Sequence, residues 1–195
     1  GKTEGGTVWL DPELTSPYAF YQYWYNVDDA DVGMLLRRLT FLPAAAILEL
    51  DESTLTEPAR RHAQRALAEE VTRLVHGADA VLQAEAASRA LFGHADLADL
   101  TSATLADALT TVPHAAIETS EPTPSIADLL VRTGLTTSKG AARRAAAEGG
   151  VYVNNVRVTD ADEQLTAEQR LHGRWVVVRR GRRTVAGVDM GVPGA

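Results

Sequence analysis

The amino-acid sequence predicts an α+β protein: an all-helical domain followed by a small α/β domain of two short helices and β-hairpins. Three observations support this. Apolar residues in 16–112 recur with a helical period. After about residue 125, short valine-rich runs flank turn residues, which is typical of hairpins. Between the two patterns, residues 113–125 form a polar stretch with three prolines and no period, which predicts a linker.

The composition excludes several classes of protein. The chain has 195 residues, 45% of them hydrophobic and 23% charged, which is neither collagen-like nor disordered. No apolar run reaches the roughly 18 to 20 residues that a membrane helix needs, and the first residues do not resemble a signal peptide, so we expect a cytoplasmic protein with no membrane contact. Cysteine is absent, and the five histidines never fall three to five residues apart. We therefore expect no metal site.

The net charge of −7 is unevenly distributed along the chain. Residues 1–120 hold 8 Lys and Arg against 18 Asp and Glu, a net charge of −10. Residues 121–195 hold 11 against 8, a net charge of +3. An acidic body joined to a basic tail is a common layout for proteins that dock a polyanion with one end. The division favours nucleic-acid binding by the C-terminal part.

The helical domain can be followed element by element. Residues 1–15 are expected to be a loop from a larger domain, and residues 18–25 hold six of the eleven aromatic residues. Because this cluster contains no Arg or Lys, we expect a packed helix or domain junction rather than a base-stacking platform.

Further helices follow from the spacing of apolar residues and from proline and glycine at the ends. The expected segments are a helix over 28–40, helices opened by Pro43 and Pro58 with a stop at Gly77, and a further pair before Gly93 and over 104–109.

The C-terminal domain predicts two helices and two hairpins. A short helix starts at Ile126 and ends at Gly134, and a second runs from the Thr137–Ser138 cap to 148–150. One hairpin turns at Asn154–Asn155, since Asn tolerates a positive φ, and another turns at 180–183. Residues 191–195 are expected to be frayed.

The second of these helices carries the strongest functional signal in the sequence. Lys139 and Arg143 lie one turn apart with Arg144 beside them, while the opposite side is alanine-rich. Guanidinium groups on a rigid helix bind phosphates, and the helix dipole at the Ser138 end adds an attraction for anions. Arg157 and residues 179–183 would extend the basic surface. A solvated basic face without a ligand is the alternative.

The order of three segments resembles the RNA-binding domain first described in ribosomal protein S-four. The segments are Ile-Ala-Asp-Leu-Leu at 126–130, Ser-Lys-Gly-Ala-Ala-Arg-Arg at 138–144 and Gly-Gly-Val-Tyr-Val-Asn-Asn at 149–155. In that family the basic helix lies against folded RNA. The sequence departs from the pattern at Asn155, usually Gly, and at Ala146, where a bulkier residue is common and whose small size implies a thinner core.

Motifs along nearly the whole chain resemble the C-terminal part of the bacterial tyrosyl-tRNA synthetase family. They are Gly1–Thr3, Trp9–Asp11, Thr15–Tyr18, Phe20–Gln22, Asp28–Asp29, Thr40–Leu42, Ala68–Thr72, Val75–Gly77 and Ala90–Phe92. In that family the end of the class I signature loop is followed by a helical anticodon-stem-binding domain and then by an S-four type domain.

The resemblance implies roles for individual residues. Lys2, with Thr3, would close the signature loop that binds ATP, and Lys2 would act catalytically on the charge that develops on the ATP phosphates. Ser138, Lys139, Arg143, Arg144 and Arg157 would bind RNA. ATP, with Mg²⁺ in the full enzyme, would be a substrate, and this chain alone would bind neither and would be inactive. The partner would be tRNA(Tyr). The full enzyme would be a homodimer through its missing catalytic domain, and this chain a monomer.

Two other hypotheses remain at this point. One is a stand-alone S-four type RNA-binding factor without catalysis. The other is a helical protein-interaction module whose basic tail binds an acidic partner.

Overall fold

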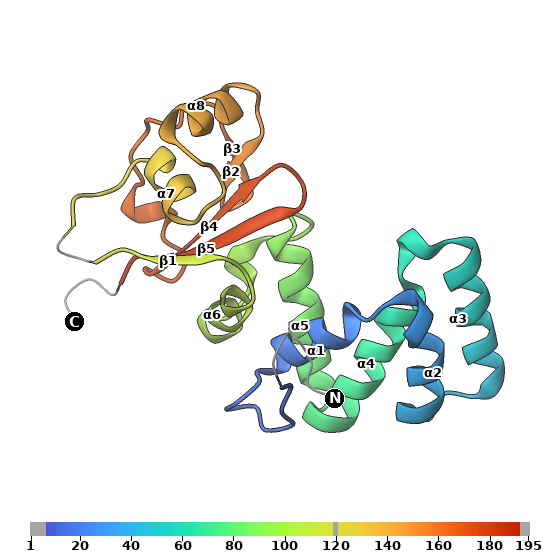
Figure 1. Cartoon of the computed structure of the whole chain (residues 1–195). Coiled ribbons are helices and arrows are strands. Elements are labelled where there is room, and N and C mark those ends of the chain that lie inside the picture. Colours follow the sequence, from blue (N-terminus) through green and yellow to red (C-terminus); the bar gives the residue numbers. More distant parts are fainter. Residues whose placement is uncertain (1–6, 119–120, 192–195) are drawn as a thin grey trace. The chain divides into compact units, whose positions relative to one another are not determined.

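The structure is a computed structural model that describes residues 7–118 and 121–191 (Figure 1). The chain divides into two compact units, residues 1–85 and 86–195. Lys2 and Thr3, and residues 192–195 of the tail that was expected to fray, lie outside the described residues. Helices and one mixed sheet confirm the α+β class.

The helices of the first unit are α1 (Pro17–Tyr25), α2 (Asp29–Leu39), α3 (Ala44–Thr56), the 3-10 helix η1 (Pro58–Arg60) and α4 (His62–His76), and α5 (Ala78–Leu91) begins in this unit and ends in the next. The second unit adds η2 (Leu97–Asp99), α6 (Ser102–Thr110), β1 (His114–Ala116), α7 (Ile126–Arg132), α8 (Lys139–Ala147), β2 (Val151–Val153), β3 (Val156–Val158), η3 (Ala167–Gln169), β4 (Trp175–Arg180) and β5 (Thr184–Asp189). The predicted helix over 28–40 and both predicted hairpins are confirmed.

In the first unit, α1, α2 and α3 all pack against α4. The buried core includes Phe20, Leu36 and Leu67. The aromatic cluster is a packed helix, as predicted, because Tyr18, Phe20 and Tyr21 of α1 are buried. The ring of His76 meets that of Phe20 edge to face at 4.8 Å, and burial lowers the pKa of this histidine.

The segment opened by Pro58 differs from the prediction, because it is broken into two helices. Arg61 has a φ of 52°, in the left-handed region, so η1 ends there and α4 starts at the next residue. The Arg61 guanidinium donates hydrogen bonds to the carbonyl oxygens of Tyr25, at 2.7 Å, and Val27, at 3.2 Å. These bonds fix the break and tie it to the end of α1.

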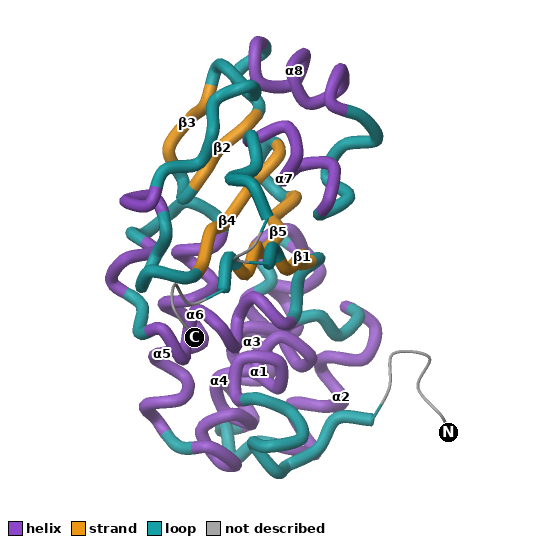
Figure 2. The backbone as a smooth tube through the Cα atoms, turned by 90° about the vertical axis from the view of Figure 1, so that its left-hand side faces the viewer, coloured by secondary structure: helices purple, strands orange, loops and turns teal. Residues whose placement is uncertain are grey.

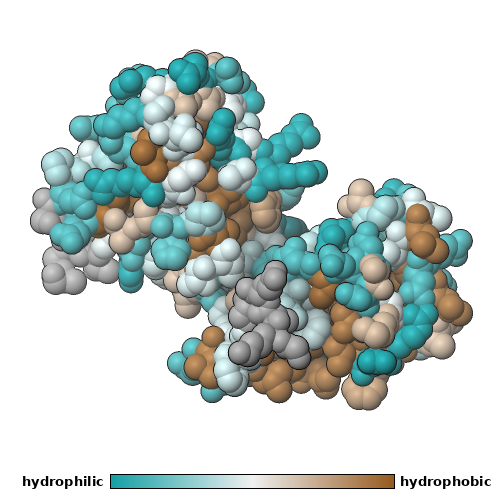
Figure 3. Space-filling model, viewed as in Figure 1, coloured by the Kyte–Doolittle hydropathy of each residue, from teal (hydrophilic) through white to brown (hydrophobic). Residues whose placement is uncertain are grey.

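Large apolar side chains also lie on the surface of the first unit, where Figure 3 shows brown patches. The most exposed are Trp9, Leu10, Leu14, Phe41, Leu48, Leu55, Leu74 and Leu82. Among the residues that the structure describes, we find no helix both long and apolar enough to cross a membrane.

The second unit is built on a five-stranded sheet of order β1-β5-β4-β2-β3 (Figure 2). Only the β1–β5 pair is parallel among the pairs of this sheet. Side chains on a strand alternate between faces. One face joins α7 and α8 in the core through Val151, Val153, Val176, Val178, Ala186 and Val188.

Helix α6 packs on the opposite face, at Gly187. A Cβ atom at this position would lie 2.9 Å from Cδ2 of the buried Leu109. Real Cβ atoms do not approach that closely, so the close packing of α6 against β5 requires glycine.

The boundary between the units differs from the expected linker at 113–125. Residues 114–116 form β1, and the Ile117 N–H donates to the Asp189 carbonyl at 2.8 Å. Residues 86–112, expected in the helical domain, belong to the second unit, because α6 covers its sheet and the Asn155 side chain donates to the Ala90 carbonyl at 2.7 Å. The sequence from residue 16 to residue 112 looks helical, and the pairing of β1 with a distant strand has no local signal.

We expect Gly187→Ala to destabilise the second unit by about 1 to 3 kcal/mol, because the added methyl group overpacks the contact with Leu109. Urea denaturation followed by the amide signals of β4 and β5 measures this. Gly140→Ala is the matched control, since its nearest neighbours would lie at 3.8 Å and its helical position favours alanine. Equal stability of the two variants would contradict the packing constraint.

Candidate nucleic-acid interface

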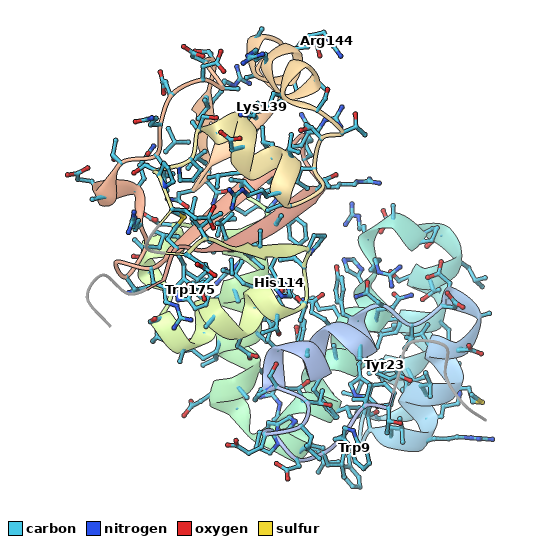
Figure 4. The ribbon with its side chains drawn as sticks, turned by 60° about the vertical axis from the view of Figure 1, so that its left-hand side comes forward. Trp9, Tyr23, His114, Lys139, Arg144 and Trp175 are labelled. Carbon is cyan, nitrogen blue, oxygen red and sulfur yellow. The ribbon has the colours of Figure 1, made fainter. Side chains whose placement is uncertain are left out.

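Helix α8 holds the predicted basic residues on its exposed side. The Ser138 side chain caps the helix by accepting from the Ala141 N–H at 3.2 Å. Ala142, Ala145 and Ala146 are buried in the core. Since these alanines fix which side of α8 packs, Lys139, Arg143 and Arg144 are left on the exposed side, and Figure 4 labels the first and last of them.

Two of these three cations form ion pairs with acids from other elements. The Lys139 ammonium lies 2.7 Å from a carboxylate oxygen of Asp128 on α7. Nε of Arg143 donates to both carboxylate oxygens of Asp162, at 3.0 and 2.9 Å. The cations hold the pKa of each carboxyl below its usual range. Within the described chain, Arg144 has no ion pair.

Arg157 lies elsewhere, on the sheet face opposite α8. Its strand neighbour Val158 points into the core, so Arg157 points away from it. In the register of the sheet, Tyr152 of β2 stands opposite Arg157 of β3 on one side and Arg179 of β4 on the other. The predicted RNA-binding residues therefore divide into two groups. One group is Ser138 with the α8 cations Lys139, Arg143 and Arg144. The other is Arg157 alone, which lies in a sheet row with Tyr152 and Arg179.

The sheet row places a tyrosine between two guanidinium groups. Cζ of Arg179 lies 4.2 Å from the Tyr152 ring centroid and Cζ of Arg157 lies 5.8 Å from it. Nη2 of Arg157 also donates to the Tyr152 hydroxyl at 3.3 Å. This hydrogen bond lowers the pKa of Tyr152, and the charges of Arg157, Arg179 and Arg182 add to the effect.

Arg179 is held more firmly than its neighbours. Its side chain is only 8% exposed and donates to the Gly181 carbonyl at 2.9 Å. No carboxylate within the described ranges pairs with it. A charge this deeply buried needs compensation, and the Tyr152 ring and the carbonyl provide part of it. Nε of Arg179 is buried and has no hydrogen-bond partner among the described residues. Arg157, Arg182 and Arg183 are exposed and free of ion pairs among residues 7–118 and 121–191.

The unit that carries these cations is neutral as a whole. Residues 86–195 contain 12 Lys and Arg and 12 Asp and Glu, whereas residues 1–85 contain 7 and 14. The net charge of +3 for residues 121–195 is thus cancelled by the acids of 86–120, which fold with them. The capacity to bind an anion depends on where the cations lie and not on net charge.

Tyr152 and the acids Asp128 and Asp162 were not among the predicted site residues. Tyr152 has a signal in the sequence, because alternation places it on the same face as Arg157 once the hairpin is recognised. The acid partners of α8 come from other elements, and nothing in their spacing indicates them.

A separate cavity of about 350 Å³ lies on the α6 side of the sheet. Its lining includes Leu109, His114 and Trp175, the last two labelled in Figure 4. None of the α8 or sheet-row cations lines it. In the part of the chain that the structure describes, no cluster of three His, Cys, Asp or Glu side chains is arranged to hold a metal ion.

We expect Arg157→Ala to raise the pKa of Tyr152 toward the ordinary value, because the variant removes both the hydrogen-bond donor and a charge that stabilise the phenolate. Carbon-13 NMR of the tyrosine Cζ signals across a pH series measures the shift. Arg183→Ala is the control, since Arg183 is not among the charges that act on Tyr152. A Tyr152 pKa equal to that of the wild-type protein in Arg157→Ala would contradict the assignment.

The sequence matches two protein-family models. Residues 1–93 match the family described as tRNA synthetases class I (W and Y). Residues 104–186 match the Tyrosine--tRNA ligase SYY-like C-terminal domain. The second match begins before the expected linker, in agreement with the structure in placing α6 with the sheet of the second unit.

Two curated relatives agree with these models. The Tyrosine--tRNA ligase of Streptomyces coelicolor is 53% identical over 190 residues, which are 97% of this chain and 44% of the relative. That of Mycobacterium sp. (strain KMS) is 54% identical over 187 residues, 96% and 44% of the two chains. A solution structure of a tyrosyl-tRNA synthetase C-terminal domain is 35% identical and covers 50% of this chain and 96% of that one, with a TM-score of 0.41.

The chain thus spans less than half the length of the curated relatives it matches. Family models match both units, and more than half of the residues are identical to those of curated relatives over nearly the whole chain. The chain belongs to the tyrosyl-tRNA synthetase family and corresponds to the C-terminal part of its members.

Proposed function

We propose that this chain is the tRNA-binding portion of a tyrosine-tRNA ligase, an enzyme that attaches tyrosine to tRNA(Tyr) in an ATP-dependent two-step reaction through tyrosyl-adenylate. The observation that carries the proposal is the pair of cationic groups on the unit matched by the C-terminal family model. The α8 cations and the sheet row both present guanidinium groups from rigid elements. Such groups suit phosphodiesters, which they bind in a bidentate manner.

The ion pairs of α8 are compatible with this role. Both pairs have cations that are more than half exposed, and exposed pairs contribute little to stability. A phosphate can therefore share or replace the carboxylate. The helix N-terminus at Ser138 adds a favourable dipole near the same surface.

We place the second unit against the elbow or the long extra arm of tRNA(Tyr), and the helices of residues 16–85 nearer the anticodon stem. The first unit has few free cations for this purpose, since Arg37, Arg60 and Arg65 pair with acids. The acidic unit would then approach RNA over a small area, and the second unit would supply most of the affinity.

Most of the catalytic site would lie in the part of the enzyme outside this chain, and Lys2 would contribute to it. Lys2, matched by the class I model, would stabilise charge that develops on the ATP phosphates, with Thr3 completing the signature loop. ATP and its Mg²⁺ would be held mainly by upstream residues, which would also form the homodimer, while this chain alone would be monomeric. We place the enzyme in the cytoplasm, where tRNA is charged.

The alternative of a stand-alone S-four type factor is not favoured. It would account for residues 104–186 and leave the class I synthetase match over residues 1–93 without explanation.

The triple variant Lys139→Ala, Arg143→Ala and Arg144→Ala should bind tRNA(Tyr) more weakly and with a flatter salt dependence. Each lost phosphate contact lowers the slope of log affinity against log salt by about 0.7 to 0.9. The fold should persist, because the alanine side of α8 is unchanged. Fluorescence anisotropy over a salt series is the measurement.

The control is a second triple variant that removes the same positive charge from the first unit. It carries Arg38→Ala, Arg60→Ala and Arg73→Ala. We expect a much smaller change in slope. If the triple α8 variant had the wild-type affinity and slope, the RNA site would not lie on this helix.

The chain alone should show no tyrosine-dependent pyrophosphate exchange, whereas the chain extended upstream to the length of its relatives should. In that longer enzyme, Lys2→Ala should lower the activation rate by roughly 10² to 10³, the usual cost of losing one electrostatic stabiliser, with tRNA affinity unchanged. Turnover by the isolated chain, or a loss of tRNA affinity with normal activation, would contradict these roles.

A further inference from the structure

The carboxylates that pair with α8 are themselves fixed by the first turn of α7. Asp162 lies in the segment after β3, and its neighbours on both sides bond to α7. The Ala127 N–H donates to the Ala161 carbonyl at 2.8 Å, and the Ile126 N–H donates to the Glu163 carbonyl at 3.0 Å. The Asp162 N–H in turn donates a hydrogen bond to the Asp160 carboxylate at 2.9 Å. The backbone that carries the Asp162 carboxylate is therefore bonded to α7, which packs against α8.

Asp128 is fixed in a different way. It forms a capping box with Ser125, in which the Ser125 hydroxyl lies 2.6 Å from one Asp128 carboxylate oxygen and accepts from the Asp128 N–H at 3.2 Å. The other carboxylate oxygen meets the Lys139 ammonium. One helix end thus sets the positions of both acids that touch the basic helix.

These acids use only part of the hydrogen-bonding capacity of their cations. Asp162 bonds to Nε of Arg143 alone, and within the described chain neither Nη group of that residue has a partner. A guanidinium has one N–H at Nε and four at its Nη groups. Four N–H donors therefore remain on the Nη groups, and one from each group points to the edge opposite Nε, where a phosphate can bind in a bidentate manner.

We propose that Asp162, together with Asp128, is a positioning residue for RNA binding: it holds the Nε edge of Arg143 and leaves the two Nη groups for a phosphate of the RNA. The proposal rests on the proposed function of α8 as a phosphate-binding helix. A long side chain held in this way loses less freedom when it binds.

The carboxylate also repels a phosphate. This repulsion weakens RNA binding and so opposes the positioning effect. The repulsion is weakened, because the guanidinium holds a phosphate at its Nη edge apart from the carboxylate on its Nε side. Salt screens the longer interaction more strongly, with a Debye length of about 8 Å at physiological ionic strength. The net contribution of Asp162 to RNA binding should then be favourable.

Two substitutions separate the hydrogen bond from the charge. Asp162→Ala removes both, whereas Asp162→Asn removes the charge and keeps an oxygen that accepts from Nε of Arg143. We expect the alanine variant to bind tRNA(Tyr) about two- to fivefold more weakly, the range for one exposed pair, and the asparagine variant to bind at least as well as the wild-type protein. Glu163→Gln removes one charge from the same segment and should change little.

Asp162→Ala is also made in a chain that already carries Arg143→Ala. This double variant shows whether Asp162 affects tRNA affinity through Arg143. In that background, Asp162→Ala should cause no further loss of affinity. In the otherwise wild-type chain, the Arg143 Nε–H signal in the NMR spectrum should shift when Asp162 is replaced by alanine. A merely structural role for Asp162 would leave the affinity loss in place in that background and would overturn the proposal.

Tighter binding by both the alanine and asparagine variants would mean that the carboxylate competes with phosphate, which overturns the proposal. So would an alanine variant with wild-type affinity while the triple α8 variant loses binding. If the triple variant itself binds normally, the proposed function of α8 is wrong, and this inference is overturned with it.

Discussion

The second unit depends on the alternation of side chains across its five-stranded sheet. One face must be apolar, because α7 and α8 cover it, and the valines of β2 and β4 fill that core. The other face is divided between the contact of α6 with Gly187 and the sheet row centred on Tyr152. A one-residue slip of β3 or β4 would turn Arg157 or Arg179 toward the α7 and α8 side of the sheet, and Val158 or Val178 away from it. The fold and the cationic surface therefore have the same origin.

Much of the fold could be predicted from the sequence because its signals are local. Proline and glycine mark several helix ends, and Asn154 and Asn155 take φ angles of 46° and 66° in the turn where two Asn residues predicted them. The features that were missed are long-range. β1 consists of three residues that pair with the last strand of the chain, and the division at residue 85 depends on α6 packing against a sheet some 75 residues further along.

The candidate site shows the same limit. Periodicity placed Lys139, Arg143 and Arg144 on the exposed side of α8, which the structure confirms. Periodicity did not indicate that Asp128 and Asp162 would lie beside these cations. Those contacts depend on how the segment after α7 and the segment after β3 run in space, which residue spacing does not specify. Arg157 was assigned to the same surface as α8, but the pleat of β3 directs it to the other side of the sheet.

The balance of 12 positive and 12 negative side chains in the second unit bears on how fast it meets its ligand. A neutral body exerts little attraction beyond one Debye length, about 8 Å in physiological salt, so long-range steering toward a polyanion is weak. Encounter with RNA should then proceed near the rate of an unsteered pair, about 10⁵ to 10⁷ M⁻¹s⁻¹. Differences between RNA partners would arise after contact, in how long each complex survives.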